Sequence, residues 1–164
     1  MQCIKDVIHD MSTPSWINSV PYDFGHAHEG TPKADEWRTM STIYLPVALI
    51  SLWGDGMLHP SPDVAAHFLR ILDHTMALVS AVYLVCKQTT SQACVTAYLD
   101  CITRYIRDLQ KLHPHADYCT NHHVAIHIYD FLLLFGPVQS WWCFPFERLI
   151  GQIQWLSSNH KFGK

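Results

Sequence analysis

Hydrophobic residues recur every three or four positions along most of this chain, which is the spacing of one face of an α-helix. A short helix is predicted over residues 1–10, and a longer one begins at Lys33. Pro46 lies inside the longer run and predicts a kink, because proline lacks a backbone N–H and clashes with the preceding turn. The sequence Gly54-Asp55-Gly56 predicts the end of this helix.

Capping residues mark the helices that follow. Ser61 before Pro62 is typical of a capped helix start, and Gly136 before Pro137 is typical of a helix end. These helices are expected at about residues 62–87, 89–112, 121–135 and 145–156. No segment alternates with a period of two. The sequence therefore predicts an all-α fold of five or six helices in a single irregular helical domain over residues 1–164, without a β-sheet.

The distribution of apolar residues also predicts where each helix lies. The helix at 62–87 is apolar over more than one face in its second half, which favours a central position. The helix at 89–112 has one apolar and one charged face, so it should border solvent. In the last helix a single stripe is expected to be buried, and it consists of Phe146, Leu149, Ile150, Ile153 and Leu156.

Residues 11–32 contain three prolines and two glycines among small and polar residues. This composition is typical of a loop. Three aromatic residues, Trp16, Tyr22 and Phe24, are expected to pin it to the rest of the domain. We therefore interpret 11–32 as an ordered loop segment.

Composition narrows the functional classes. Charged residues make up only 15% of the chain, and the net charge is −3 with histidine neutral. This is not the basic surface that a domain needs to hold nucleic acid by itself. So few charges predict marginal solubility, a surface that meets a partner, and self-association through exposed apolar surface. The longest apolar runs span about eleven residues, short of a bilayer, so no membrane partner is predicted.

The six cysteines form no C-x-x-C pair and no dense framework. This favours a reducing, intracellular location with cysteines that act as small hydrophobic side chains. Cys119 and His122 form a C-x-x-H, and His123 and His127 lie one helical turn apart. Such residues can bind zinc, although a closed site needs four ligands. Alternatively, Thr120 or Asn121 caps the helix while the histidines pack or face a polar seam.

The most unusual segment runs from Phe135 to Gly151 and places tryptophans, phenylalanines and prolines around one carboxylate, Glu147. An acid among aromatic side chains is a candidate for catalysis or binding, because burial shifts the pKa of a carboxyl group. Gly151, one turn later, leaves room for a metal or a phosphate to approach. Alternatively, Glu147 is a first-turn acid that complements the helix dipole. The residues expected to position it are Gly136, Pro137, Trp141, Trp142, Phe144, Pro145 and Phe146.

The run from Asn121 to Lys161, with its Gly-Pro and Phe-Pro-Phe-Glu-Arg elements, resembles the C-terminal region of fungal CACTA-type (En/Spm-like) DNA transposases. A related block follows the transposase core in plant elements as a domain of unknown function. The segments at 14–16, 33–38 and 49–54 also resemble that family. The resemblance thus covers residues 14–160.

The resemblance implies a role in DNA transposition. Such transposases use an RNase H-like fold in which an Asp-Asp-Glu triad holds two magnesium ions, and these activate water and then a DNA 3′-hydroxyl. Glu147 matches the final acid and would be a magnesium ligand. Cys119 and His122 resemble a short motif upstream of that acid, which implies a zinc role for them. The implied partners are the remainder of a transposase catalytic core and, through it, transposon-end DNA in the nucleus.

The chain departs from the family pattern because it shows no strands for an RNase H sheet and no assignable pair of aspartates. We therefore expect a fragment of a larger transposase that is inactive alone. The alternative is a non-enzymatic helical interaction module derived from a transposon. In that case the aromatic block is a docking surface and Glu147 an ordinary structural acid.

Overall fold

The computed structural model describes residues 2–17, 33–54, 56 and 59–155, and these residues form helices α1 to α7 with short π- and 3₁₀-helical segments. The elements are α1 (Gln2–Asp10), α2 (Ala34–Thr39), the π-helical η1 (Met40–Tyr44), α3 (Leu45–Trp53), α4 (Pro62–Val85), α5 (Gln92–Leu112), α6 (Thr120–Phe135), the 3₁₀-helical η2 (Val138–Ser140) and α7 (Phe144–Trp155). Because α2, η1 and α3 are continuous, they count as one long helix. The predicted all-α class is confirmed, and the described residues contain no strand.

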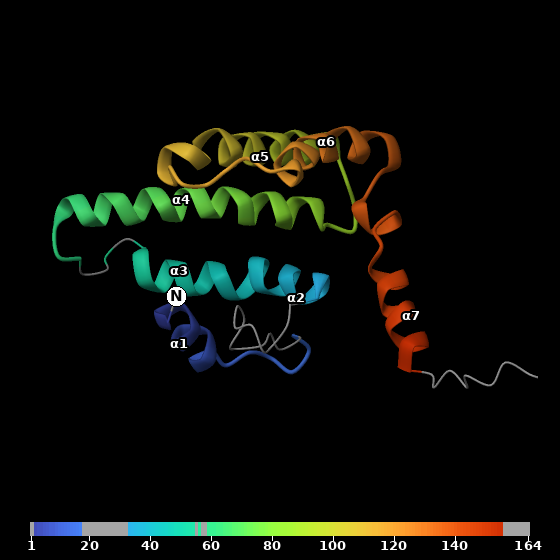
Figure 1. Cartoon of the computed structure of the whole chain (residues 1–164), viewed down its shortest axis with the longest axis horizontal. Helices are drawn as coiled ribbons and strands as arrows, with labels where there is room; N and C mark the ends of the chain where they lie inside the picture. Colours follow the sequence, from blue (N-terminus) through green and yellow to red (C-terminus); the bar gives the residue numbers. More distant parts are fainter. Residues whose placement is uncertain (1, 18–32, 55, 57–58, 156–164) are drawn as a thin grey trace, which may run out of the picture.

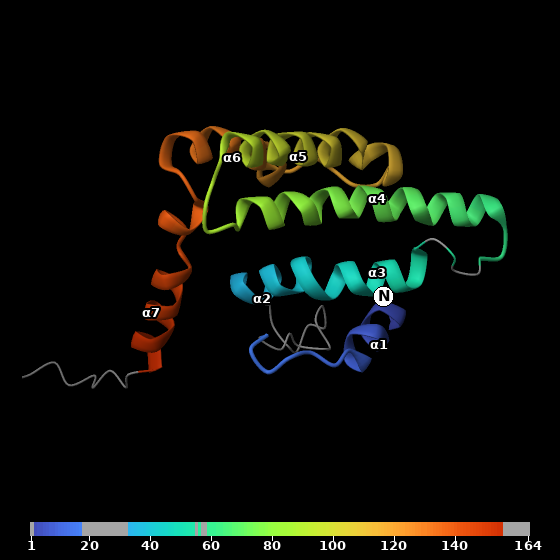
Figure 2. The ribbon, with the colours of Figure 1, turned by 180° about the vertical axis from the view of Figure 1, so that it is seen from behind.

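The helices lie in layers (Figure 1). Helix α1 packs on α3, the long α2–η1–α3 helix packs on α4, and α4 packs on α5, which in turn contacts α6. Seen from behind, the order is the same, with α7 at one end of the stack and pointing away from α5 and α6 (Figure 2). Helix α4 therefore has neighbours on two sides, and its predicted central position is confirmed.

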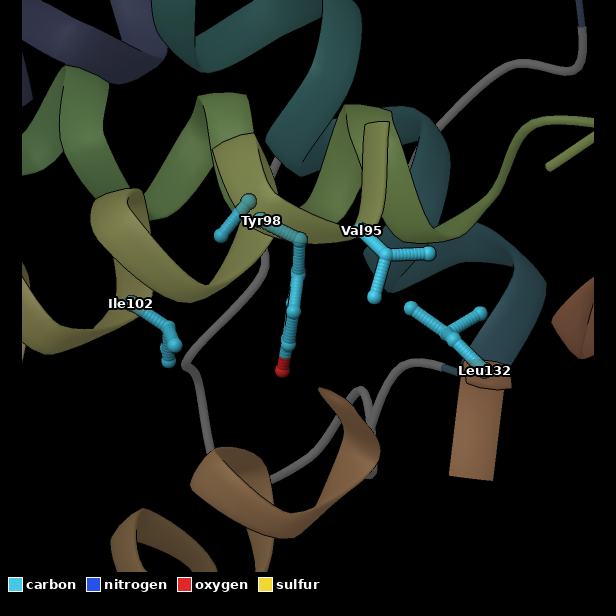
Figure 3. Close-up of a cluster of buried hydrophobic side chains, with 5 residues drawn as sticks. Val95, Tyr98, Ile102 and Leu132 are labelled. Carbon is cyan, nitrogen blue, oxygen red and sulfur yellow. The ribbon is translucent and has the colours of Figure 1, made fainter. Parts of the chain in front are cut away.

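Two separate groups of buried side chains hold the layers together. The first joins α1 to η1 and α3, and its fully buried members are Ile8, Met40, Tyr44 and Ala48. The second joins α4, α5 and α6, and it consists of Ala81, Val95, Tyr98, Ile102 and Leu132. In Figure 3 the side chain of Tyr98 lies between those of Ile102 and Val95, with its hydroxyl directed away from α5.

Two small side chains and a histidine of α4 are buried within the bundle. Ala77 and Ala81 lie one turn apart on α4, and both are almost completely buried. His74, one turn earlier, is also buried; its Nε2 lies 2.9 Å from the carbonyl oxygen of Tyr105, and the two rings stack at 4.6 Å. The carbonyl only accepts, so Nε2 carries the hydrogen and donates it. This hydrogen bond satisfies a buried polar group at the helix contact.

Serine side chains cap the starts of α4 and α5, as predicted for Ser61, and α5 begins at Gln92, slightly after the predicted residue 89. Ser61 Oγ accepts the backbone N–H of Val64 at 3.3 Å, and Ser91 Oγ accepts that of Cys94 at the same distance. Each bond satisfies one of the donors that a helix start leaves free. Helix α4 ends at Val85, slightly before the predicted Lys87.

The helix that contains Pro46 continues through it. Just before the proline, η1 takes π-helical geometry, and the N–H of Leu45 bonds to the carbonyl of Met40, five residues earlier. A π segment widens the turn by one residue. The helix thereby accommodates the missing N–H of Pro46, and α3 ends at Trp53 with Gly54 as its cap, as predicted.

The segment before α2 differs from the prediction. Trp16 does not pin it, because its side chain is 79% exposed. Ile17 packs against the first buried group instead, and Thr13 Oγ1 lies 3.4 Å from the hydroxyl of Tyr44. Tyr22 and Phe24 lie outside the described residues.

Helix α4 is long and apolar enough, by length and composition, to cross a membrane. The uninterrupted apolar runs in the sequence are too short to cross a bilayer. An 18-residue window of α4 nevertheless has high mean hydropathy, because the window tolerates the polar residues that interrupt those runs. About 28% of that window is buried within the protein, and the helix packs between η1–α3 and α5. A central helix of a soluble bundle has the same properties, so the finding is weak evidence for a membrane span.

Tyr98 provides a direct test of the α5–α6 contact. Its hydroxyl donates to the carbonyl of Ala125 at 2.6 Å. We predict that Tyr98→Phe lowers the free energy of unfolding by about 1 kcal/mol, because it removes this hydrogen bond between α5 and α6. Urea denaturation measures the change. Tyr83→Phe is the control, because Tyr83 lies exposed on α4.

The same residue makes stability depend on alkaline pH. Burial raises the pKa of Tyr98, so the folded state holds its proton more tightly than the unfolded state, in which the pKa is about 10. The resulting stability is present below about pH 10 and is lost as pH rises through the folded-state pKa. Between roughly pH 9.5 and 11, the range in which unperturbed tyrosine titrates, the free energy of unfolding should therefore fall less in Tyr98→Phe than in the wild type. Equal slopes in the two proteins would contradict this assignment.

Candidate functional site

The aromatic segment begins with a tight turn after α6. Gly136 has a φ of 74°, in the left-handed region that favours glycine. A Cβ there would meet nothing within 4 Å, so the requirement for glycine is conformational. The backbone N–H of Gly136 donates to Leu132, and Trp141 Nε1 donates back to the Gly136 carbonyl at 3.2 Å. The predicted glycine cap is confirmed, and it redirects the chain into η2.

Four residues from three parts of the chain fix this turn to the bundle, and we call them the end junction: Arg38, Cys86, Gln139 and Trp142. Gln139 Nε2 donates to the carbonyl of Cys86 at 2.9 Å, which joins η2 to the end of α4. The guanidinium of Arg38 lies over the ring of Trp142, 5.9 Å from its centroid. Burial raises the pKa of the Cys86 thiol, and the nearby positive charge of Arg38 opposes that rise.

The aromatic side chains next to the end junction contact one another in pairs. Trp142 stacks on Phe144 with centroids 4.6 Å apart, and Trp141 meets Phe131 edge to face at 6.0 Å. Both geometries are favourable for aromatic pairs. Trp141 and Trp142 are half-buried, whereas Pro145 is exposed. The tryptophans therefore connect the bundle to Phe144 at the start of α7, while Pro145 faces outward.

Helix α7 does not bury the stripe that its sequence pattern predicts. The described side chains of that stripe are each more than half exposed, and they are Phe146, Leu149, Ile150 and Ile153. Leu156 lies outside the described residues. The prediction is wrong because α7 leaves the bundle after the end junction and has only sparse contact with other elements (Figure 1). Periodicity shows that a helix has an apolar face, but not what covers it.

The backbone of Glu147 lies in the first turn of α7, where acids complement the helix dipole. Its side chain lies outside the described residues, so its predicted catalytic and magnesium-binding roles stay predictions. A Cβ at Gly151, one turn later, would meet nothing within 4 Å. The space that was predicted around this glycine is therefore open.

Cys119 and His122 lie together at the start of α6. The backbone N–H of Cys119 donates to His122 Nδ1 at 3.1 Å, and Cys119 Sγ lies 3.5 Å from the same nitrogen. This is a capping arrangement, in which the third residue of the helix reaches back to the cap. It engages Nδ1, the ring nitrogen of His122 that lies nearest the thiol. No group of three or more metal-ligating side chains that could hold an ion occurs in the described part of the chain.

A groove of about 490 Å³ lies between α4 and α5, lined by Leu69, Arg70, Asp73, His74, Arg104, Asp108, Lys111 and Leu112. Several of its charged side chains lie next to side chains of opposite charge. Hydrogen bonds from Arg107 and then Lys111 hold the pKa of Asp108 below its usual range, and Arg104 lies 4.0 Å from Asp73. Exposed pairs of this kind contribute little to stability.

Comparisons with protein-family models, curated proteins and solved structures gave no match to this chain.

The sequence pattern indicated the aromatic segment and Trp142 but not the other three members of the end junction, Arg38, Cys86 and Gln139. Gln139 and Cys86 are separated by 53 positions, and neither belongs to a recognisable motif. A glutamine between a helix-breaking Gly136-Pro137 and an aromatic pair is a weak signal for a tertiary hydrogen bond. Only the fold shows that the end of α4 lies beside η2.

The start of α6 allows capping and zinc binding to be separated. Serine is a preferred capping residue, so we predict that Cys119→Ser changes the free energy of unfolding by less than about 0.5 kcal/mol. Thermal denaturation and elemental zinc analysis measure the two properties, with Cys3→Ser as the control at another exposed cysteine. Loss of bound zinc together with clear destabilisation, confined to Cys119→Ser, would contradict the capping interpretation.

Proposed function

We propose that this chain is a helical docking module of a CACTA-type DNA transposase, inactive alone, in which α7 packs on the catalytic core and supplies Glu147. The observation that carries the proposal is the exposed apolar face of α7, formed by Phe146, Leu149, Ile150 and Ile153. The family part of the proposal is supported by the sequence resemblance over residues 14–160. The docking part is supported by the position of this face.

The α7 face has the character of an interface. Interface cores are depleted in charged residues, and each apolar side chain that becomes buried contributes about 1.5–3 kcal/mol. Because these four side chains are only 52–66% exposed, their burial gives a gross gain of roughly 3–7 kcal/mol, in the lower part of the cost of about 4–15 kcal/mol for association. The face alone is therefore marginal, and a stable complex needs further contact.

The end of α6 offers that contact. Leu134 and Phe135 are 72% and 62% exposed, and they precede the turn that leads to α7. The C-terminal end of α6, to which both residues belong, lies at the same end of the molecule as α7 (Figure 1). A partner that meets this end can bury apolar side chains of both helices. Because Glu147 follows Phe146 directly, docking brings the first turn of α7 to the partner.

The partner that we propose for the α7 face is the RNase H-like core of the transposase, because the sequence resemblance implies it. In that assembly Glu147 would join two aspartates of the core as a magnesium ligand. Magnesium held in this way activates water and the DNA 3′-hydroxyl for in-line attack. The bundle of α1 to α6 serves to present α7, and the end junction fixes its direction.

Charge placed on the α7 face tests the docking step. We predict that Leu149→Glu and Ile153→Glu abolish binding to a purified RNase H-like core of a CACTA-type transposase, because burying an unpaired carboxylate is costly. Gln152→Glu is the matched control, since it adds the same charge to the same helix outside the apolar face. Size-exclusion chromatography with light scattering measures the complex. Binding that survives in both face variants would contradict the proposal, as would a wild-type chain that associates only with itself.

Glu147→Gln tests the catalytic step separately. In a full-length transposase that contains this region, we predict that strand-transfer activity falls by more than about 100-fold. Substitution of a residue that only hydrogen-bonds to a metal ligand already costs about 10–100-fold in metal affinity or activity, and Glu147 would be a direct ligand. Helicity by circular dichroism and binding to the core should be unchanged, because the substitution keeps the size of the side chain. Activity within about threefold of wild type would remove Glu147 from the site and leave a non-enzymatic docking module.

A further inference from the structure

Two histidines on α6 face each other in a way that neither capping nor packing requires. His123 and His127 are one turn apart on the solvent side of the helix, and their Nε2 atoms lie 3.3 Å from each other. The two rings are steeply inclined, at 75°, with centroids 4.7 Å apart. On the far side of His127, Nδ1 lies 3.2 Å from Oδ2 of Asp130.

Asp130 determines which nitrogen of His127 is available. An ionised carboxylate only accepts hydrogen bonds, so the hydrogen of His127 lies on Nδ1. Nε2 of His127 therefore carries a free lone pair, and in the observed contact it accepts the N–H of His123. A carboxylate behind a ligating histidine is the arrangement that orients the ring and raises the basicity of its other nitrogen.

The spacing of the two nitrogens fits a metal ion in place of that hydrogen. Zinc binds imidazole nitrogen at about 2.0–2.1 Å with tetrahedral angles, which separates two ligand nitrogens by about 3.3 Å. The observed separation has this value. Both lone pairs become available when His123 carries its hydrogen on Nδ1 and the two exposed rings turn so that their Nε2 atoms point to one position beside the present contact. The helix already holds the rings at that spacing.

We propose that His123 and His127 form an open surface site for a divalent transition metal, oriented by Asp130 and completed by water. Imidazole ligands favour zinc, copper and nickel over magnesium or calcium. With two protein ligands the site is accessible and of modest affinity, unlike a closed structural zinc site. It is separate from Cys119 and His122, and it does not depend on the proposed transposase function.

Zinc titration of the purified chain by calorimetry tests the site. We expect one binding event that weakens about 10–100-fold in His123→Gln and in His127→Gln, and about tenfold in Asp130→Asn. His67→Gln on α4 is the matched control, because it removes an exposed histidine elsewhere, and it should bind as the wild type does. Zinc should also raise the melting temperature of the wild type but not of the two α6 variants. All of these side chains are exposed, so the variants should retain their helicity.

Cobalt distinguishes the two possible sites on α6. With histidine ligands alone, bound Co²⁺ lacks the sulfur charge-transfer absorption that a thiolate ligand gives, and Cys119→Ser should leave its spectrum unchanged. Thiolate absorption that disappears in Cys119→Ser would assign the metal to Cys119 and His122 and overturn the inference. Equal zinc affinity in wild type, His123→Gln and His127→Gln would overturn it too, as would the absence of binding.

Discussion

Among the described helices, α4 and α5 make the most extensive contact, and the placement of α6 depends on it. Ala81 of α4 is buried in one cluster with Val95, Tyr98 and Ile102 of α5. His74 adds a hydrogen bond across the same contact, so its buried Nε2 has a partner. Once α4 and α5 are placed, α6 follows through Tyr98 and Leu132. The turn after α6 then starts from a fixed point.

This order explains how a helix with an exposed apolar face can have a defined direction. Helix α7 contributes little to the core, yet the segment before it is held by Gln139 at the end of α4 and by Trp142 under Arg38. Both anchors are on parts of the bundle that the α4–α5 contact and the first buried group stabilise. The apolar face therefore follows a segment that is attached to the bundle at two points.

Sequence reasoning predicted the parts of this structure that depend on local chemistry. Ser61 and Gly136 act on the backbone within four residues, so their caps follow from residue type. The buried and charged faces of α5 also follow from periodicity. The exposure of Leu149 and its neighbours on α7 does not, because the same pattern suits a helix that packs on its own bundle or on another protein. In the same way, the spacing of His123 and His127 places them on one face, but only the structure shows that Asp130 orients one ring.

The π-helical turn at Met40–Tyr44 adds one residue to the long α2–η1–α3 helix. Each residue of an α-helix turns the chain by about 100°, so the same sequence wound as a regular helix would rotate α2 by that angle relative to α3. Arg38 would then point away from Trp142, and Asp35 would turn with it. The widened turn beside Pro46 thus sets the rotation of α2 about the helix axis. This rotation places Arg38 over the ring of Trp142, close to the start of α7.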